Sequence, residues 1–219
     1  MKIHRGNPIV PITHPDIEAY SEAHTSPESE GVRALIESSD RELKYIDMLS
    51  GKLVGQLLKI LVQVSGAQRI LEIGTFTGYS AVTMAEALPD DGELITLEMK
   101  GRYINLARKH FLESTVAHKI TLVEGNAQET IDELEGEFDF IYLDGDKLRY
   151  SFYYEKAIKK LKSNGLLVVD NVLWDATVLN PHDNKSQAIN DFNKLVSEDT
   201  RVEQVLLPIR DGVNVIRKI

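Results

Sequence analysis

The strongest constraint on the fold is an alternation of short apolar runs with helical patterns, which extends from residue 69 to residue 196. Such an alternation is typical of a parallel sheet with helices on both faces. Two β-rich runs follow, separated by Pro208, Asp211 and Gly212, and they predict a terminal hairpin. The sequence thus predicts an α/β fold, doubly wound around a mostly parallel seven-stranded sheet with a C-terminal antiparallel hairpin. The expected strands are 69–73, 94–98, 120–124, 138–143, 166–170, 202–207 and 213–217, and the expected helices are 79–88, 102–112, 127–134, 150–161 and 186–196.

Residues 1–65 differ from this pattern, because an irregular arm is followed by helical segments alone. A first helix is expected over 15–23, which starts with a proline, a favoured first-turn residue. Residues 26–28 open a second helix, and Ser50 is the expected N-cap of a third. These helices should cover one side of the sheet or form a subunit contact. Since no linker or repeat interrupts the chain, we expect a single domain, 1–219, in which residues 66–219 form the α/β core.

The bulk composition excludes several classes of partner. The 219 residues are 42% apolar, which is enough for one domain with a substantial core. With 34 acidic and 25 basic residues the net charge is −9, which argues against nucleic acid as a partner. The chain has no cysteine, so disulfides and thiolate metal sites are excluded. No apolar run approaches a membrane span and no signal-peptide core is present, so we expect a cytoplasmic protein without a membrane partner.

The first strand runs through a glycine-containing turn directly into a helix, in the sequence EIGTFTGYS at 72–80. Such a turn leaves amide N–H groups without carbonyl partners, and Gly74 would let a ligand approach the main chain. The spacing G-x-x-x-G lacks the complete dinucleotide fingerprint. Glu72 beside the turn favours a ligand with an ammonium group. S-adenosylmethionine has both a carboxylate and an ammonium and would suit this turn; a βα turn without any ligand is the alternative.

Polar residues also follow the next two strands, at the edge where open parallel sheets bind ligands. Glu98 ends the second strand about 20 residues beyond Gly78, a separation at which an acid can accept hydrogen bonds from both ribose hydroxyls. The third strand leads into Gly125, Asn126 and Ala127, where a small residue can leave room for an adenine ring. The three strand ends together favour a nucleoside-containing ligand.

The fourth and fifth strands end in acids. Asp144 follows the fourth, and Asp170 and Asn171 follow the fifth. If these strands are neighbours, the three oxygen donors suit a hard cation such as Mg²⁺ that keeps positions for water or substrate. Alternatively, Asp144 caps the next helix, and Asp170 and Asn171 form a turn. Lys147 lies close to this set, where a dication would disfavour its ammonium form, so it could act as a base; a solvated surface lysine is the alternative.

Together these motifs resemble the cation-dependent, S-adenosylmethionine-dependent O-methyltransferases of the catechol and caffeoyl-CoA type. The resemblance extends from about Met48 to the C-terminus and is carried by Gly55-Gln56-Leu57, EIGTFTGYS (72–80), ALPDDG (87–92), Glu98, EGNA (124–127), DGDK (144–147), DNVLW (170–174) and LPIRDGVNVIRK (207–218). It implies a Rossmann-like methyltransferase fold and a homodimer. The cofactor site that it implies consists of Met48, Glu72, Gly74, Thr75, Tyr79, Ser80, Glu98, Met99, Asn126, Ala127 and Asp144.

The resemblance also implies a reaction. Asp144, Asp170 and Asn171 would bind the divalent cation, most simply Mg²⁺, with Mn²⁺ or Ca²⁺ as further options. The cation would be chelated by the two hydroxyls of a vicinal diphenol, Lys147 would be the catalytic base beside Asp144, and one hydroxyl would be methylated. Trp174 and the polar stretch 175–185 would form a wall or lid over the acceptor.

The sequence departs from the family pattern at a few positions near these motifs. The family usually has alanine, aspartate, asparagine and glycine where this chain has Gly145, Glu98, Arg149 and Ala176. The last two lie near the expected substrate entrance, so they bear on the acceptor. Two other functions remain as alternatives: an NAD-dependent oxidoreductase that uses the same βα turn, and an S-adenosylmethionine-binding protein without catalysis.

Overall fold

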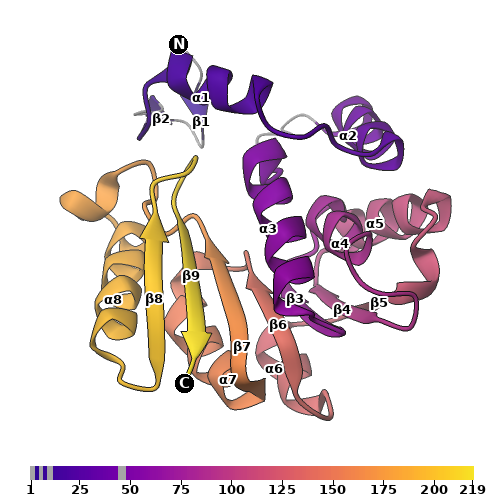
Figure 1. Ribbon diagram of the computed structural model, residues 1–219. Coiled ribbons are helices and arrows are strands. Elements are labelled where there is room, and N and C mark those ends of the chain that lie inside the picture. Colours follow the sequence, from indigo (N-terminus) through magenta and orange to yellow (C-terminus); the bar gives the residue numbers. More distant parts are fainter. Residues whose placement is uncertain (1–2, 5–6, 9–11, 44–47) are drawn as a thin grey trace.

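The computed structural model describes residues 3–4, 7–8, 12–43 and 48–219. One sheet of seven strands has the order β5-β4-β3-β6-β7-β9-β8, and a short antiparallel pair, β1 (Ile3–His4) and β2 (Asn7–Pro8), lies apart from it (Figure 1). Pairing is parallel from β5 to β7, whereas β9 is antiparallel to β7 and β8. This confirms the predicted fold class. The large sheet consists of β3 (Arg69–Ile73), β4 (Glu93–Glu98), β5 (Ile120–Glu124), β6 (Phe138–Leu143), β7 (Leu161–Asp170), β8 (Val202–Leu207) and β9 (Val213–Lys218).

Helices cover both faces of the sheet because each inner strand is apolar on both sides. On one face, α3, α4 and α5 pack over a cluster that includes Leu58, Ile70 and Tyr142; on the other, α6, α7 and α8 pack over a cluster that includes Phe138 and Phe192. The side chains in both clusters are largely buried, as expected for a three-layer α/β domain. These helices are α3 (Gly51–Ser65), α4 (Tyr79–Ala85), α5 (Gly101–Glu113), α6 (Ala127–Glu133), α7 (Tyr150–Lys160) and α8 (Asn184–Glu198).

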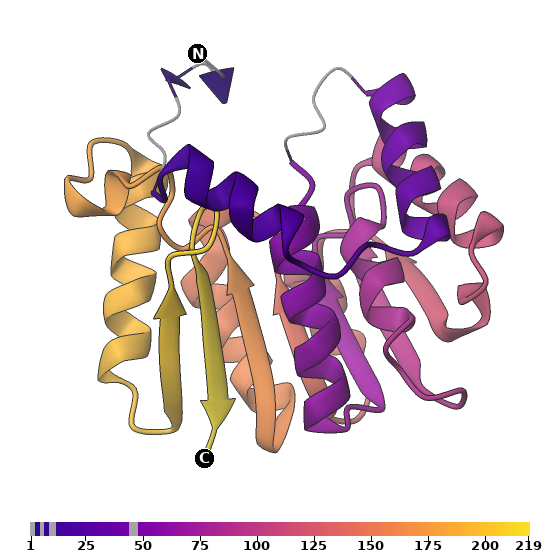
Figure 2. The same cartoon turned by 45° about the horizontal axis from the view of Figure 1, so that its top comes forward.

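The N-terminal helices lie over the edge of the sheet where the parallel strands end. Figure 2 shows α1 (Pro15–Ala23) crossing above this edge towards α3. Hydrogen bonds fix both of its ends: Thr13 Oγ1 donates to the Pro208 carbonyl (3.1 Å), and Lys52 Nζ donates to the Glu22 carbonyl (2.6 Å). Helix α2 (Glu30–Glu42) packs against α4 and α5. No helix in the described part of the chain is long and apolar enough to cross a membrane.

Several predicted boundaries were wrong by a few residues. Helix α2 starts at Glu30 rather than within 26–28, because the Ser29 side chain accepts the Val32 N–H and so caps the helix there. Ser50 precedes α3 as predicted, but its side chain makes no capping bond. Helix α4 stops at Ala85 rather than at 88, and β7 begins at Leu161 rather than at 166. Short 3₁₀ helices at Ala117–Lys119, Lys147–Arg149 and Thr177–Leu179 were not predicted.

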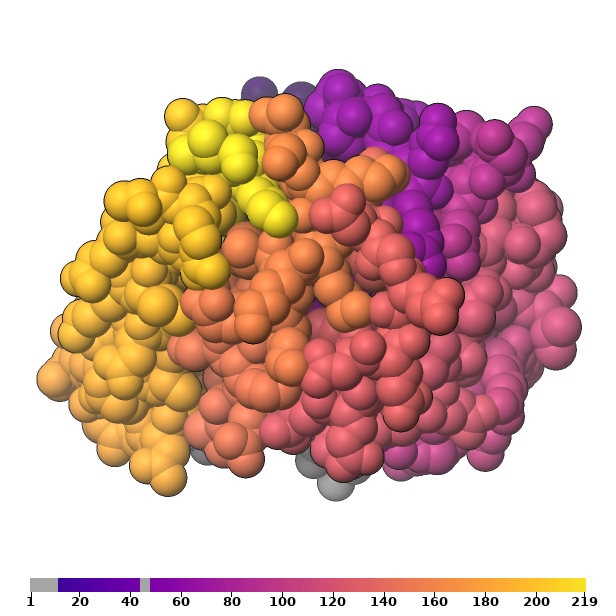
Figure 3. All heavy atoms as spheres, turned by 90° about the horizontal axis from the view of Figure 1, so that it is seen from below, coloured from indigo at the N-terminus to yellow at the C-terminus, as the bar shows by residue number. Residues whose placement is uncertain are grey.

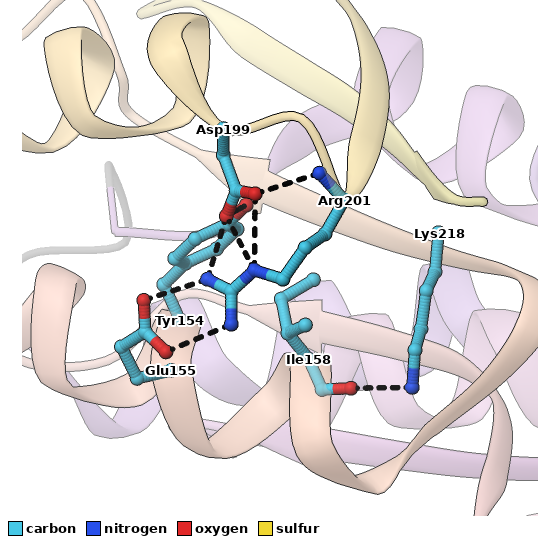
Figure 4. Close-up of polar contacts among 6 residues, drawn as sticks. All are labelled: Tyr154, Glu155, Ile158, Asp199, Arg201 and Lys218. Carbon is cyan, nitrogen blue, oxygen red and sulfur yellow. Dashed lines mark hydrogen bonds and ion pairs between the residues drawn. The ribbon is translucent and has the colours of Figure 1, made fainter.

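Ion pairs and a helix cap fix the hairpin to the helical layer. Arg201 pairs with Asp199 (2.6 Å) and with Glu155 of α7 (2.8 Å), and Tyr154 donates to the same Asp199 carboxylate (Figure 4). Lys218 Nζ donates to the Ile158 carbonyl near the end of α7 (2.8 Å). Seen from below, the yellow C-terminal residues lie beside orange segments from the α7–β7 region (Figure 3). These contacts hold the hairpin at the edge where β6 and β7 begin, whereas the predicted site residues lie at the opposite edge of the sheet.

Candidate active site

The turn between β3 and α4 uses several of its own amide donors within the protein. The Gly74 and Thr75 N–H groups donate to the Leu97 carbonyl (3.1 and 3.2 Å), and the Phe76 N–H donates to Glu98 Oε2 (2.9 Å). Gly74 has φ +106°, and an added Cβ would overlap the carbonyl oxygen of Asp144. This glycine thus allows the end of β6 to approach the turn closely; the predicted approach of a ligand at Gly74 stays a prediction.

Glu72 lies beneath this turn without exposed surface. Its two carboxyl oxygens accept hydrogen bonds from Ser80 Oγ and Thr96 Oγ1, both at 2.5 Å. Burial, with a smaller contribution from the charges of Asp144 and Glu98, raises the pKa of Glu72 to about 8. The carboxyl group therefore joins β3, α4 and β4 and holds a proton at neutral pH, so it adds no full negative charge beside the turn.

Glu98, at the end of β4, is held by main-chain donors. Its carboxylate accepts the N–H groups of Phe76 (2.9 Å), Met99 (2.9 Å) and Lys100 (3.0 Å), and the residue is 9% exposed. These bonds fix the Glu98 carboxylate against the turn between β3 and α4. In the same turn, the Thr75 hydroxyl lies 2.5 Å from the Thr96 hydroxyl. A carboxylate has about four acceptor positions, so Glu98 retains capacity for a ligand hydroxyl.

A pocket opens between this turn and the start of α3. It brings together six of the eleven predicted cofactor residues, and its lining consists of Met48, Leu49, Ser50, Gly74, Thr75, Phe76, Tyr79, Ser80 and Asp144. The other five predicted residues do not line it: Glu72 and Glu98, described above, and Met99, Asn126 and Ala127. Met99 is 63% exposed beyond Glu98. Asn126 caps α6 through the Gln128 N–H (3.1 Å), and Ala127 is the first residue of that helix.

The acids and the lysine predicted at the ends of β6 and β7 belong to one hydrogen-bonded network. Lys147 Nζ donates to Asp144 Oδ1 (2.5 Å) and to the Tyr150 hydroxyl (2.6 Å), and the Tyr150 hydroxyl donates to the Asp170 carbonyl (2.9 Å). Lys147 is 8% exposed on its short 3₁₀ helix, so it is not a solvated surface lysine. The network joins two neighbouring strands, because β6 and β7 pair directly.

Asp170 is buried and accepts two hydrogen bonds, from the Tyr142 hydroxyl (2.8 Å) and from the Asn171 N–H (2.7 Å). Burial and the nearby charge of Asp144 raise the pKa of Asp170 to about 7. The two predicted carboxylates are therefore within electrostatic range of each other. In the described residues no three His, Asp or Glu side chains are grouped so that they could hold a metal ion; the predicted set has only two carboxylates and the amide of Asn171.

Comparison with known proteins identifies the enzyme family to which the chain belongs. The family model described as O-methyltransferase matches residues 22–219. The chain belongs to the O-methyltransferase family. This membership confirms the resemblance drawn from the motifs and decides against the NAD-dependent oxidoreductase: the enzyme is an S-adenosylmethionine-dependent O-methyltransferase of the caffeoyl-CoA type.

Individual relatives of the methyltransferase support the same class. A probable caffeoyl-CoA O-methyltransferase 2 of Dictyostelium discoideum is 33% identical over 208 residues, which cover 91% of this chain and 90% of that protein. Tricin synthase 2 of Oryza sativa subsp. japonica is 36% identical over 75% of this chain, but the chain spans only 61% of its length. The SAH-bound crystal structure of the Podospora anserina methyltransferase PaMTH1 superposes with a TM-score of 0.86 at 30% identity, over 93% of this chain and 94% of that chain.

The sequence did not predict that Tyr142, Tyr150 and Ser50 form hydrogen bonds in the network around Asp170 and Lys147. Tyr142 and Tyr150 are fully buried, and Tyr142 also lies 2.9 Å from the Ser50 hydroxyl. A buried tyrosine needs a partner for its hydroxyl, so a tyrosine in the apolar run 138–143 was a usable signal. The same bond explains why Ser50 does not cap α3: its hydroxyl is directed to β6.

The segment after β7 adopts an unusual backbone. Trp174, Asp175 and Ala176 all have positive φ, at 47°, 54° and 61°. The Leu173 N–H donates to the Asp211 carbonyl (2.9 Å), and the Asp175 N–H donates to Asp211 Oδ1 (2.5 Å), so the β8–β9 turn holds this segment. The predicted wall of the methyltransferase is thus a strained but hydrogen-bonded loop above the end of β7.

Proposed function

We propose that the methyltransferase transfers the methyl group of S-adenosylmethionine to one hydroxyl of a vicinal diphenol, with a divalent cation beside the two adjacent acids. The observation that carries this proposal is the network that joins Asp144, Lys147, Tyr150 and Asp170 across the ends of β6 and β7. It lies next to the pocket at the β3–α4 turn, since Asp144 belongs to both. A nucleophile and a methyl donor would thus be held side by side, which is the main source of acceleration in a two-substrate transfer.

The pocket residues fit the cofactor as far as their chemistry can be tested. Glu98 is fixed by three amides and retains acceptor capacity for one ribose hydroxyl. Thr75, Tyr79 and Ser80 line one side of the pocket and Met48 the other. The SAH-bound state of the Podospora anserina relative supports a cofactor of this chemical class here. Asn126 and Ala127 would have to meet the cofactor beyond this pocket.

The donor set at β6 and β7 also fits a hard cation, which we expect to be Mg²⁺, with Mn²⁺ or Ca²⁺ as substitutes. Asp144, Asp170 and Asn171 offer oxygen ligands, and each carboxylate oxygen in the network retains a second lone pair. Two carboxylates within electrostatic range of each other are destabilised as a pair, and a cation between them would relieve this. When bound, the cation would supply Lewis acidity that lowers the pKa of a chelated phenol hydroxyl.

In this scheme Lys147 would first release its own ammonium proton to water, and the neutral amine would then take the phenolic proton at Nζ. Its two partners, Asp144 and Tyr150, hold the nitrogen in a fixed position at the site. Trp174, which is 7% exposed, would shield the acceptor ring from water together with the loop that follows β7. The acceptor would therefore be a flat diphenol that enters between this loop and the start of α3.

The test is methyl transfer from S-adenosylmethionine to catechol, measured with and without a chelator. We expect activity that is lost with EDTA and restored by Mg²⁺. Asp170→Asn should lower kcat/KM by at least about 100-fold, because the residue would be a direct cation ligand. The matched control is Asp132→Asn, which removes an exposed acid that pairs with Lys156 on the outer helices. It should leave the rate unchanged.

Two results would contradict this proposal in different ways. Turnover that is undiminished by EDTA would remove the cation from the reaction. If a set of diphenols gives no turnover while calorimetry detects S-adenosylmethionine binding, the chain is a cofactor-binding protein without this activity.

A further inference from the structure

Arg210 occupies a backbone position that arginine rarely adopts. It lies in the turn between β8 and β9 with φ +50°, a region that favours glycine. Its side chain extends to the first residue of α3: a Cβ atom added to Gly51 would overlap the guanidinium group, with Cζ at 2.9 Å. A strained backbone that holds a long cationic side chain in one place indicates a constraint other than folding.

The strand order locates this guanidinium on the acceptor side of the site. The cofactor pocket lies over β3, the acids lie at the ends of β6 and β7, and β9 and β8 continue the sheet beyond β7. The turn that carries Arg210 is bonded to the loop after Asp170 through Leu173 N–H and the Asp211 carbonyl. Arg210 therefore bridges from the acceptor loop to the start of α3, whose preceding residue, Ser50, lines the pocket.

The charges around Arg210 indicate what it could recognise. Its positive charge reaches the pocket residue Tyr79, whose hydroxyl donates to Glu28. Within the described residues the Arg210 side chain makes no ion pair and no hydrogen bond. A guanidinium at this position would attract a negatively charged substituent of an acceptor bound in the site. Arginine is also suited to bind a carboxylate or phosphate through two parallel hydrogen bonds.

We propose that Arg210 is a specificity-determining residue that binds an anionic substituent of the acceptor, so that the preferred acceptor is a vicinal diphenol with a carboxylate or phosphate remote from its hydroxyls. This inference rests on the proposed function, because it assigns the hydroxyl end of the acceptor to the acids of β6 and β7. Arg210 would hold the acceptor at a second point, remote from the hydroxyls, and would thereby fix the orientation of the aromatic ring.

The experiment compares the binding of acids with that of their neutral esters. Protocatechuate and caffeate differ in reach, and each has an uncharged methyl ester of nearly the same shape. Calorimetric titration of the protein loaded with S-adenosylhomocysteine and Mg²⁺ should give at least about tenfold tighter binding of an acid than of its ester. Arg210→Gly should abolish this difference, whereas Arg210→Lys should retain part of it.

The variants separate recognition from folding. Glycine is compatible with φ +50°, so Arg210→Gly should fold at least as well as the parent chain, which thermal unfolding verifies. Arg217→Ala is the matched control: it removes the same charge from β9 at the end remote from the site, where Arg217 pairs with Glu203, and should leave the preference intact.

Two outcomes would overturn the inference: a parent protein that binds acids and esters equally, or a preference for acids that survives in Arg210→Gly and so belongs to another cationic side chain. Methylation of the neutral esters needs no anion contact. Its absence would reject the proposed reaction, while the binding difference would still decide the role of Arg210.

Discussion

Glu72 illustrates how a single residue can differ in role from what its position in a motif suggests. It stands where an acid would meet a ligand's ammonium group, yet its carboxyl is fully enclosed and bonded to Ser80 and Thr96. The hydroxyl partners belong to a helix and a neighbouring strand, which no local pattern pairs with residue 72. The residue therefore supports the turn from below, and burial sets its protonation.

The pH dependence of stability tests this account of Glu72. Its pKa of about 8 in the folded chain exceeds the ordinary 4.5, so the folded state binds more protons than the unfolded state between these values. The stabilising effect of this group is thus complete below the ordinary pKa and is lost as the pH rises through about 8. The slope is about 1.4 kcal/mol per pH unit between the two pKa values.

Glu72→Gln, which imitates the protonated acid, should remove this contribution from the slope. Urea unfolding measured from about pH 5 to about pH 8 would reveal the change. Glu137→Gln, at an exposed position ahead of β6, is the control and should leave the slope as it is. A Glu72→Gln slope equal to that of the parent chain would mean that Glu72 is ionised in the fold.

At the scale of elements, the apolar part of each strand could be predicted from the sequence better than the polar residues by which a strand is extended. The observed β3, β5, β6 and β8 have the predicted bounds, because each is a short β-branched or aromatic run with polar residues at its ends. Strand β7 starts five residues earlier than predicted, at Leu161. Residues 162–164 are polar and exposed and fall in an irregularity of the pairing, where the register passes from Phe138–Leu161 to Phe140–Leu166, so no apolar pattern marks them.

In the candidate site, too, the residues at strand ends could be predicted, and the contacts that depend on tertiary packing could not. Asp144, Glu98 and Asp170 could be predicted because parallel strands deliver their last residues to one edge of the sheet. The Ser50–Tyr142–Asp170 contacts could not, since they depend on how α3 is placed against β6. The close packing of Gly74 against the Asp144 carbonyl could not be predicted either, because this neighbour is 70 positions further along the chain.

The loop after β7 gives a prediction at this scale. Ala176 has φ +61°, a conformation that costs a residue with a Cβ about 1–2 kcal/mol. Ala176→Gly should therefore raise the free energy of unfolding by about 0.5 kcal/mol, after the larger chain entropy of glycine is subtracted. The same change at Ala188, inside α8, should lower it by about 1 kcal/mol. Equal losses at the two positions in urea unfolding would mean that the loop is not strained.

At the scale of the whole molecule, the two faces of the sheet are covered unequally. Helix α8 lies behind β8 and β9, whereas on the other face no described helix extends over these two strands (Figure 1). Lys59 of α3 pairs with Glu86 after α4, so the flank of α3 with Leu57, Ile60 and Val64 faces away from α4, towards β7 and its neighbours. Ile60, Val64 and Val205 of β8 are exposed by 54%, 74% and 51%. An apolar face of this kind is usually covered by a partner.

We expect this face to form the interface of a homodimer, in which α3 of each chain covers β8 and β9 of the other around a twofold axis. Light scattering should then give twice the mass of one chain. The double variant Ile60→Lys and Val205→Lys should give the mass of one chain, because two unpaired charges on each side would be buried at several kcal/mol each. Leu112→Lys, an apolar position on α5 that is 83% exposed, is the control and should remain dimeric. A parent chain with the mass of one copy, or a double variant that still has the mass of two, would exclude this face as the interface.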